Sequence, residues 1–122
     1  MPKLAVGIDI IEIKRIEDAI LEWQDSFLFK VYTKAELSSC NNAVPSLAAR
    51  FAAKEAVMKA LGTGTVGMRW PDIEIISDSN GLPVVQLHGS AYEKSLELGI
   101  QEFSISISHS DIHAVAVVIG NT

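Results

Sequence analysis

The chain has 122 residues, of which 48% are hydrophobic, and carries a formal net charge of −5. A chain of this length buries about two thirds of its unfolded surface in one core, so we expect a single domain over residues 1–122. The acidic balance argues against general affinity for nucleic acid or anionic membranes, and an acidic partner would need a local basic patch. The sequence shows no apolar run of membrane-spanning length and no cationic leader segment, and we therefore expect a soluble, cytoplasmic protein.

The first expected element is a buried strand over Leu4–Ile11, because this segment is short and rich in branched apolar residues. Asp9 interrupts the strand. A buried carboxylate is costly unless it is paired, hydrogen-bonded or bound to a metal. Asp9 can cap the following helix, with Glu12 in the capping-box position, or it can belong to a site, and the two roles do not exclude each other.

A helix is expected over Glu12–Trp23, with its isoleucines on one face and charged residues toward solvent. Its exposed basic pair, Lys14 and Arg15, is the one nearest to Asp9. Lys14 can simply pair with Asp18 one turn later, which would add a few tenths of a kcal/mol, on the order of 0.3. A binding role for the pair is the alternative.

Two short segments follow. The apolar and aromatic stretch Phe27–Tyr32 fits either a helical turn or an extended connection packed on the core. Thr33 and Glu36 then have the spacing of a capping box, which predicts a short helix that ends near residues 41–42.

The longest expected helix covers Ser46–Leu61, with Ser46 as its N-cap and Gly62 as a left-handed residue at its end. Small residues share one face of this helix: Ala49, Ala53, Ala56, Val57 and Ala60. Larger apolar residues share the opposite face: Leu47, Phe51 and Met58. A helix that is apolar on two sides is buried on two sides, and in so short a chain another subunit is the expected second cover.

Four charged residues interrupt this helix: Arg50, Lys54, Glu55 and Lys59. They can form surface pairs one turn apart. The like-charge pair Arg50 and Lys54 is unfavourable on a plain surface, however, and three cations with one carboxylate suit a metal-bound polyphosphate. The spacing alone leaves both interpretations open.

Glycines follow the helix at Gly64 and Gly67, in a segment that is either a plain loop or a place where the backbone approaches a ligand closely. Strands are then expected over Ile73–Ser77 and Leu82–Leu87, joined by a turn at Asn80–Gly81.

In the last part of the chain, Ser90 and Glu93 indicate a capping box for a helix that stops at Gly99. The alternating segment Phe103–Ser108 predicts an antiparallel strand with one serine-lined face, and a final strand follows a turn. His109, at the end of the alternating segment, is either an ordinary core or turn histidine or a contact to phosphate or substrate.

Four motifs occur in order along the whole chain: GIDIIE at 7–12, RFAAKEAVMKALGTG at 50–64, DIEI at 72–75 and SISHS at 106–110. Together they resemble the holo-[acyl-carrier-protein] synthases, the short 4'-phosphopantetheinyl transferases. The resemblance implies an α+β fold in which a small antiparallel-rich sheet packs on a long central helix. It also implies a homotrimer with active sites at the subunit interfaces.

The resemblance implies that the protein transfers 4'-phosphopantetheine from coenzyme A to a serine of apo acyl carrier protein, for fatty acid biosynthesis. Adenosine 3',5'-bisphosphate is released, and Mg²⁺ is required. By this resemblance Asp9 and Glu55 are the metal ligands and act in catalysis together with Lys59. Two alternatives remain in view, a transferase with a broader range of carrier domains and a non-catalytic coenzyme A-binding trimer.

The resemblance assigns the remaining positions to substrate binding. The residues expected to contact coenzyme A are Arg50, Lys54, Lys59, Gly64 and His109. Lys14 and Arg15 match the basic start of the helix on which the family docks the acidic carrier protein. The chain departs from the family at Leu82, often a lysine, and in residues 23–28, where the usual arginines are missing. These departures affect peripheral carrier contacts rather than the chemistry.

Overall fold

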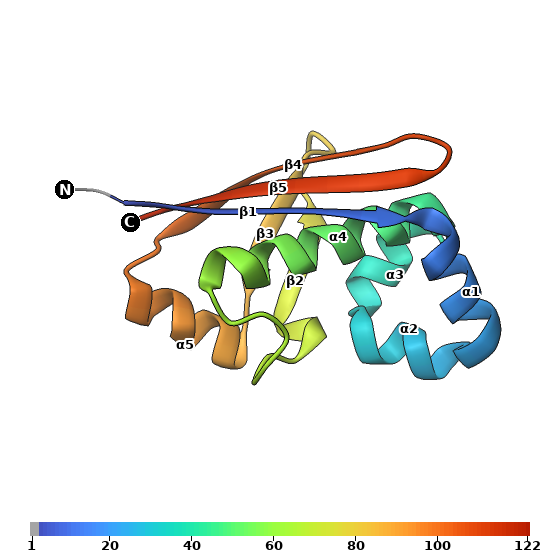
Figure 1. The fold of residues 1–122 in the computed structure, drawn as a ribbon, viewed down its shortest axis with the longest axis horizontal. Coiled ribbons are helices and arrows are strands. Elements are labelled where there is room, and N and C mark those ends of the chain that lie inside the picture. Colours follow the sequence, from blue (N-terminus) through green and yellow to red (C-terminus); the bar gives the residue numbers. More distant parts are fainter. Residues whose placement is uncertain (1–2) are drawn as a thin grey trace.

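The longest helix, α4 (Val44–Leu61), runs through the centre of the molecule, and the other elements pack around it (Figure 1). The computed structural model describes residues 3–122. The other elements, in chain order, are β1 (Leu4–Glu12), α1 (Ile13–Trp23), α2 (Asp25–Val31), α3 (Lys34–Cys40), the 3₁₀ turn η1 (Trp70–Asp72), β2 (Ile73–Ser77), β3 (Pro83–Leu87), α5 (Gly89–Leu98), β4 (Glu102–His109) and β5 (His113–Asn121). The expected α+β class and the antiparallel strands on a central helix are confirmed.

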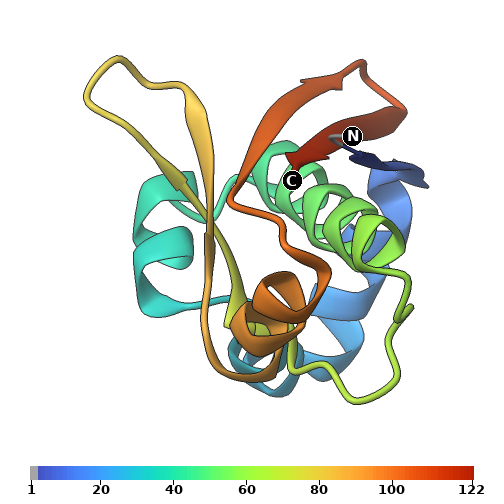
Figure 2. The same cartoon turned by 90° about the vertical axis from the view of Figure 1, so that its left-hand side faces the viewer.

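The strands form two separate antiparallel sheets, β1-β5-β4 and β2-β3. The larger sheet lies along α4, whereas the β2-β3 hairpin projects away from that sheet (Figure 2). No helix among residues 3–122 is both long enough and apolar enough to cross a bilayer.

The inner face of β1 packs on α4 at very short range. A β-carbon built on Gly7 would lie 1.8 Å from the carbonyl oxygen of Ala56, so only glycine fits there. The next inward residue, Asp9, lies opposite Ala116 of β5 and faces the last turns of α4. The close approach at Gly7 thus sets the distance at which Asp9 meets the helix.

The outer face of the same sheet is apolar and uncovered in the single chain. Leu4, Val6, Ile8 and Ile10 point away from α4, and each exposes 58–64% of its surface. Ser104, Ser106 and Ser108 of β4 are exposed on this outer face, as the register across β5 requires. The serine-lined face expected from the sequence is therefore present.

A single chain buries both sides of α4, which corrects the expectation that a second subunit covers one of them. Ala53 and Ala56 are fully buried on one side, and Leu47 and Met58 are 1% exposed on the other. The second cover comes from the segments before and after α4 in the sequence. Phe51, for example, stacks on Trp70 of η1 with ring centroids 4.7 Å apart.

Two expected helix caps, Ser46 and Ser90, are wrong, and the capping role that the sequence left open for Asp9 is excluded. Asp9 does not cap α1, because β1 stays paired as far as Glu12, and α1 begins only at Ile13. Ser46 does not cap α4, which begins at Val44 with proline in its first turn, where a missing N–H costs nothing. Ser90 lies inside α5 and donates to the carbonyl of Gly67 instead, at 3.1 Å.

Other local expectations are confirmed. Thr33 and Glu36 form a complete capping box at the start of α3. Gly62 ends α4 with a left-handed backbone at φ 76°. The two hairpin strands pair as expected, and the ambiguous Phe27–Tyr32 stretch lies largely in a short helix, α2.

We predict that Gly7→Ala lowers the free energy of unfolding by about 2–4 kcal/mol, because the added methyl group must push β1 away from the Ala56 carbonyl. Urea denaturation measures the loss. Gly81→Ala is the control, since its φ of 80° strains an alanine but nothing lies within 4 Å. It should cost only about 1 kcal/mol. Equal losses in the two variants would contradict a special close approach at Gly7.

Candidate active site

Lys59 and Asp9 meet where the last turns of α4 pass the middle of β1. The ammonium of Lys59 donates to the Asp9 carboxylate at 3.0 Å and to the Ile8 carbonyl at 2.9 Å. The Asp9 side chain is 12% exposed and the Lys59 side chain 54%. The aspartate that interrupts the apolar strand therefore has a charged partner, and the lysine remains open to solvent beside it.

Glu55, one turn before Lys59 on α4, lies beside Asp9. Burial raises the pKa of Glu55, and the negative charge of Asp9 and a hydrogen bond between the two carboxyl groups raise it further. The positive charges of Arg15 and Lys59 lower the pKa of Glu55 and so offset part of this rise. The structure thus brings Asp9, Glu55 and Lys59 together as expected. It also adds Arg15, which the sequence assigned to partner docking only.

The Asp9–Glu55 carboxylate pair fits a divalent cation. Two neighbouring carboxylates repel each other, and the negative charge of Asp9 adds to the effect of burial in raising the pKa of Glu55. Mg²⁺ prefers oxygen ligands and is commonly held by one or two carboxylates together with substrate phosphates and water. Within residues 3–122 no group of three or more His, Cys, Asp or Glu side chains is arranged to hold a metal ion.

Arg50 is placed on a different side of α4. Its guanidinium donates weakly to the hydroxyls of Ser39 on α3, at 3.4 Å, and Ser77 on β2, at 3.3 Å. The residue is only 8% exposed, and its Nε has no hydrogen-bond partner among the described residues. A buried N–H of a cation without an acceptor is costly, so this position favours an additional anionic partner.

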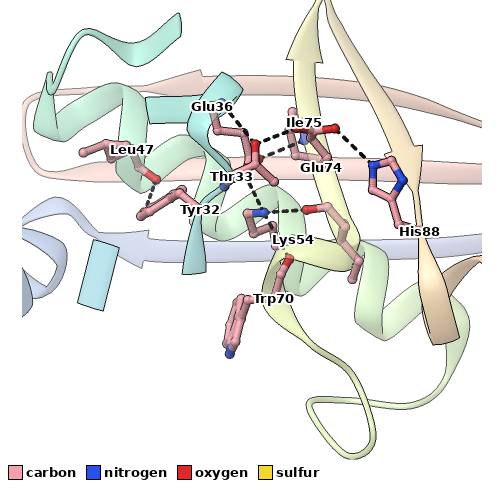
Figure 3. Close-up of polar contacts among 10 residues, drawn as sticks. Tyr32, Thr33, Glu36, Leu47, Lys54, Trp70, Glu74, Ile75 and His88 are labelled. Carbon is pink, nitrogen blue, oxygen red and sulfur yellow. Dashed lines mark hydrogen bonds and ion pairs between the residues drawn. The ribbon is translucent and has the colours of Figure 1, made fainter. Parts of the chain in front are cut away.

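Lys54 is not available to a ligand, which corrects its expected role at the nucleotide phosphates. Its ammonium is fully buried and donates to Glu36 at 2.8 Å, to the Trp70 carbonyl at 3.1 Å and to the Ile73 carbonyl (Figure 3). Three acceptors use all three N–H groups of a lysine. The sequence missed this pairing because it assigned Glu36 only to the capping box.

The other expected residues lie on the surface. Gly64 is exposed and has a left-handed backbone, with φ 56°, and a β-carbon at this position would have nothing within 4 Å, so the turn rather than crowding requires glycine. His109 is exposed at the end of β4, with Nδ1 3.4 Å from the Ser110 carbonyl. Lys14 pairs with Asp18 at 3.2 Å, as the simpler interpretation of the sequence predicts. An exposed pair of this kind contributes little and leaves Lys14 accessible.

Open grooves of the chain are found elsewhere. One of about 630 Å³ lies between β3, α5 and the start of β4, and another of about 530 Å³ lies between α2 and the segment from Thr65 to Pro71. Asp9, Glu55 and Lys59 line neither of them. Within this site the Lys59 side chain is open to solvent, whereas the Asp9 side chain is largely covered.

Comparison with known proteins places the chain in a family. Residues 5–118 match the family described as the 4'-phosphopantetheinyl transferase superfamily. The chain is 44% identical to a holo-[acyl-carrier-protein] synthase of Herpetosiphon aurantiacus, over 96% of this chain and 98% of the relative. It is 47% identical to one of Dehalococcoides mccartyi, over 95% and 97%. The crystal structure of Helicobacter pylori holo-[acyl-carrier-protein] synthase in complex with coenzyme A superposes with a TM-score of 0.87 at 35% identity, over 94% of this chain and 98% of that one.

We predict that the pKa of Glu55 in the metal-free protein is higher than that of an ordinary glutamate and depends on the charges of Asp9 and Arg15. Asp9→Asn should lower this pKa because a like charge is removed, and Arg15→Ala should raise it because a cation is removed. Titration of the Glu55 side-chain carboxyl by ¹³C NMR measures both changes. Lys94→Ala, on α5, is the control and should leave the Glu55 pKa unchanged. A pKa that does not respond to Asp9→Asn would contradict the proximity of the two carboxylates.

Proposed function

The chain belongs to the 4'-phosphopantetheinyl transferase superfamily, and we infer that it is a holo-[acyl-carrier-protein] synthase. It transfers 4'-phosphopantetheine from coenzyme A to a serine of apo acyl carrier protein, for fatty acid biosynthesis, and releases adenosine 3',5'-bisphosphate. The observation that carries the chemistry is the Lys59–Asp9 ion pair beside Glu55. A cytoplasmic location remains a prediction from the sequence.

The two alternatives are less well supported. A transferase for many kinds of carrier domain is usually about twice this length by family resemblance, whereas this chain matches its single-purpose relatives over nearly their full length. A non-catalytic coenzyme A-binding protein would have no need to keep two carboxylates and a lysine in contact, since an unbalanced carboxylate pair is costly to maintain.

The proposed reaction exchanges one phosphorus–oxygen bond for another. The carrier serine oxygen bonds to the phosphorus that bears pantetheine, the bond from this phosphorus to adenosine 3',5'-bisphosphate breaks, and the serine proton leaves. Lys59 is suited to neutralise charge on the departing phosphate, because its ammonium is open to solvent and held by two bonds to β1. Asp9 thereby orients the lysine as well.

Asp9 and Glu55 are the proposed ligands of Mg²⁺, with coenzyme A as the second substrate. When bound, Mg²⁺ neutralises pyrophosphate oxygens and makes the phosphorus a better electrophile. The raised pKa of Glu55 gives this site a defined pH dependence. A metal needs the deprotonated carboxylate, and a raised pKa means that protons compete at a higher pH than at an ordinary glutamate. The Mg²⁺ concentration required for activity should therefore rise as the pH is lowered.

Arg50, Gly64 and His109 are proposed to contact coenzyme A. Arg50 has a buried Nε without an acceptor among the described residues, which a phosphate oxygen would supply. His109 is exposed at a strand end and free to reach a ligand. Arg50 and His109 make their contacts away from Glu55 and Asp9, so one coenzyme A molecule would meet them most readily if they came from a neighbouring chain.

A homotrimer with active sites at its subunit interfaces is therefore proposed. The structural ground is the uncovered face of β1, whereas the sequence argument relied on the two apolar faces of α4. The uncovered outer face of β1, with Leu4, Val6, Ile8 and Ile10, is a contiguous apolar surface on a regular sheet. Covering each side chain contributes on the order of 1 kcal/mol or more to association. The number three comes from the family resemblance.

Lys14 and Arg15 are proposed to dock the acidic carrier protein. Both lie in the first turn of α1, and Arg15 also acts on Glu55, so docking there brings the carrier beside the carboxylate pair. Local basic groups of this kind attract an acidic partner even when the enzyme as a whole is negative.

The proposed reaction can be tested by mass spectrometry. Apo acyl carrier protein mixed with the enzyme, coenzyme A and Mg²⁺ should gain the mass of one phosphopantetheine. Glu55→Gln should slow this transfer by about 10³-fold or more, because a ligand charge is lost while the side-chain shape is kept. Glu97→Gln, on the surface of α5, is the matched control and should be unaffected. No mass gain with the wild-type enzyme would refute the function, and rapid transfer by Glu55→Gln would refute the metal assignment.

Docking of the carrier protein can be tested by charge reversal at Lys14. Lys14→Glu should raise the KM for carrier protein about 10-fold and change the KM for coenzyme A by less than about 2-fold, because charge reversal in an exposed first turn acts on encounter. Added salt should weaken the wild-type reaction in the same way, since exposed charges are screened over about 8 Å at physiological ionic strength. Lys94→Glu is the control for charge alone. If both KM values rise together in Lys14→Glu, the residue belongs to the nucleotide site.

The proposed assembly can be tested by mixing subunits. Glu55→Gln chains and His109→Ala chains, unfolded and refolded together, should regain activity in about a quarter of the sites of a cyclic trimer. The reason is that a site built from two chains can receive one intact residue from each. Light scattering should give the mass of three chains. A monomer with full activity would refute the trimer, and a trimer without regained activity would place Glu55 and His109 of the same chain in one site.

A further inference from the structure

The Lys54–Glu36 pair has no role in the proposed chemistry, and it lies at the centre of a buried polar network (Figure 3). Neither side chain exposes any surface. Burial lowers the pKa of Lys54, and the carboxylate of Glu36 opposes that change. Both oxygens of Glu36 also accept from the backbone, one from the N–H of Thr33 and the other from the N–H of Ile75, each at 2.9 Å.

The side chain of Lys54 bonds to backbone carbonyls on the far side of the glycine-containing loop, residues 62–69. It thereby joins two parts of the chain that this loop separates. Lys54 lies two turns before the end of α4, where this loop begins. Its ammonium binds the carbonyls of Trp70 and Ile73, where the loop ends and β2 starts. Helix α4 is therefore attached to both ends of the loop, covalently to the end at residue 62 and through the Lys54 ammonium to the segment that follows residue 69.

The contacts of the loop are concentrated near its two ends. At the first end, Gly62 and Thr63 donate to the carbonyls of Lys59, at 3.1 Å, and Met58, at 3.2 Å. At the far end, the Arg69 carbonyl accepts from Asp72, Met68 packs against the core, and the Gly67 carbonyl accepts from the Ser90 hydroxyl. Residues 64–67 are exposed. The position of this loop relative to Glu55 and Lys59 consequently depends on where its two ends are anchored.

We propose that Lys54 is a positioning residue, whose buried ammonium anchors the returning end of the residue 62–69 loop so that Gly64 lies beside the coenzyme A site. This role rests on the proposed function. Burial of an ion pair is weak as a source of stability, because desolvation offsets most of the attraction between the charges. Its value here is the fixed direction of its bonds to Trp70 and Ile73, which an apolar side chain could not provide.

The test uses the double variant Lys54→Met with Glu36→Gln, in which no unpaired charge remains in the core. Release of the Trp70 and Ile73 carbonyls should make trypsin cleave after the exposed Arg69 about 10-fold faster. The KM for coenzyme A should rise about 10-fold, while the KM for carrier protein changes less than about 2-fold. Val57→Ala is the matched control, because Val57 is fully buried in the same helix and its truncation removes core packing without removing a hydrogen bond of its side chain.

A purely structural role would give the opposite pattern. The double variant would then lose thermal stability as Val57→Ala does, with cleavage after Arg69 and both KM values unchanged, and the proposal would be overturned. If the double variant does not fold, Lys54→Leu with Glu36→Gln, which also removes the bonds to the Trp70 and Ile73 carbonyls, is tested by the same readouts and should change them in the same direction. Calorimetric binding of coenzyme A separates this proposal from the reaction: a wild-type protein that binds but does not transfer would refute the function, and a weakened affinity in the variant would still support Lys54.

Discussion

The structure depends on how α4 is held on two sides. On one side the missing side chain of Gly7 lets β1 reach the helix backbone at Ala56. On the other side the buried ammonium of Lys54 ties the helix to Glu36 and to the start of β2. These two attachments fix both the distance and the rotation of α4. Glu55 and Lys59 therefore meet Asp9 of β1, and the helix carries two charged groups to the aspartate at one place on the surface.

Because these two attachments fix the rotation of α4, its charged residues face different surroundings. Lys54 is wholly internal, Arg50 is nearly buried against α3 and β2 with its Nε unpaired among the described residues, and Glu55 and Lys59 face β1. The strand that carries Asp9 has a second, outer face, where Leu4, Val6, Ile8 and Ile10 are exposed, and the proposed neighbouring chain would cover this face.

Much of this arrangement could be predicted from the sequence, and the failures have physical reasons. Periodicity and turn residues were sufficient for the strands, the hairpin and the Thr33–Glu36 capping box, because these depend on neighbours in the chain. The motifs singled out Asp9, Glu55 and Lys59, which the structure brings together, and their roles stay predictions. Lys54 was misassigned because the same capping residue, Glu36, also pairs with it from 18 positions away, and no local pattern reveals such a contact. The surface for assembly was likewise sought on α4, whereas tertiary packing covers α4 and leaves β1 open.

The most direct test of this arrangement is a crystal structure of the protein with coenzyme A and Mg²⁺. The metal should lie between the carboxylates of Asp9 and Glu55, with Lys59 on the pyrophosphate, and Arg50 and His109 of a second chain should contact the same coenzyme A molecule. Lys54 should remain bound to Glu36 and to the carbonyls of Trp70 and Ile73. A metal bound away from Asp9 and Glu55, or a coenzyme A molecule held by one chain alone, would contradict it.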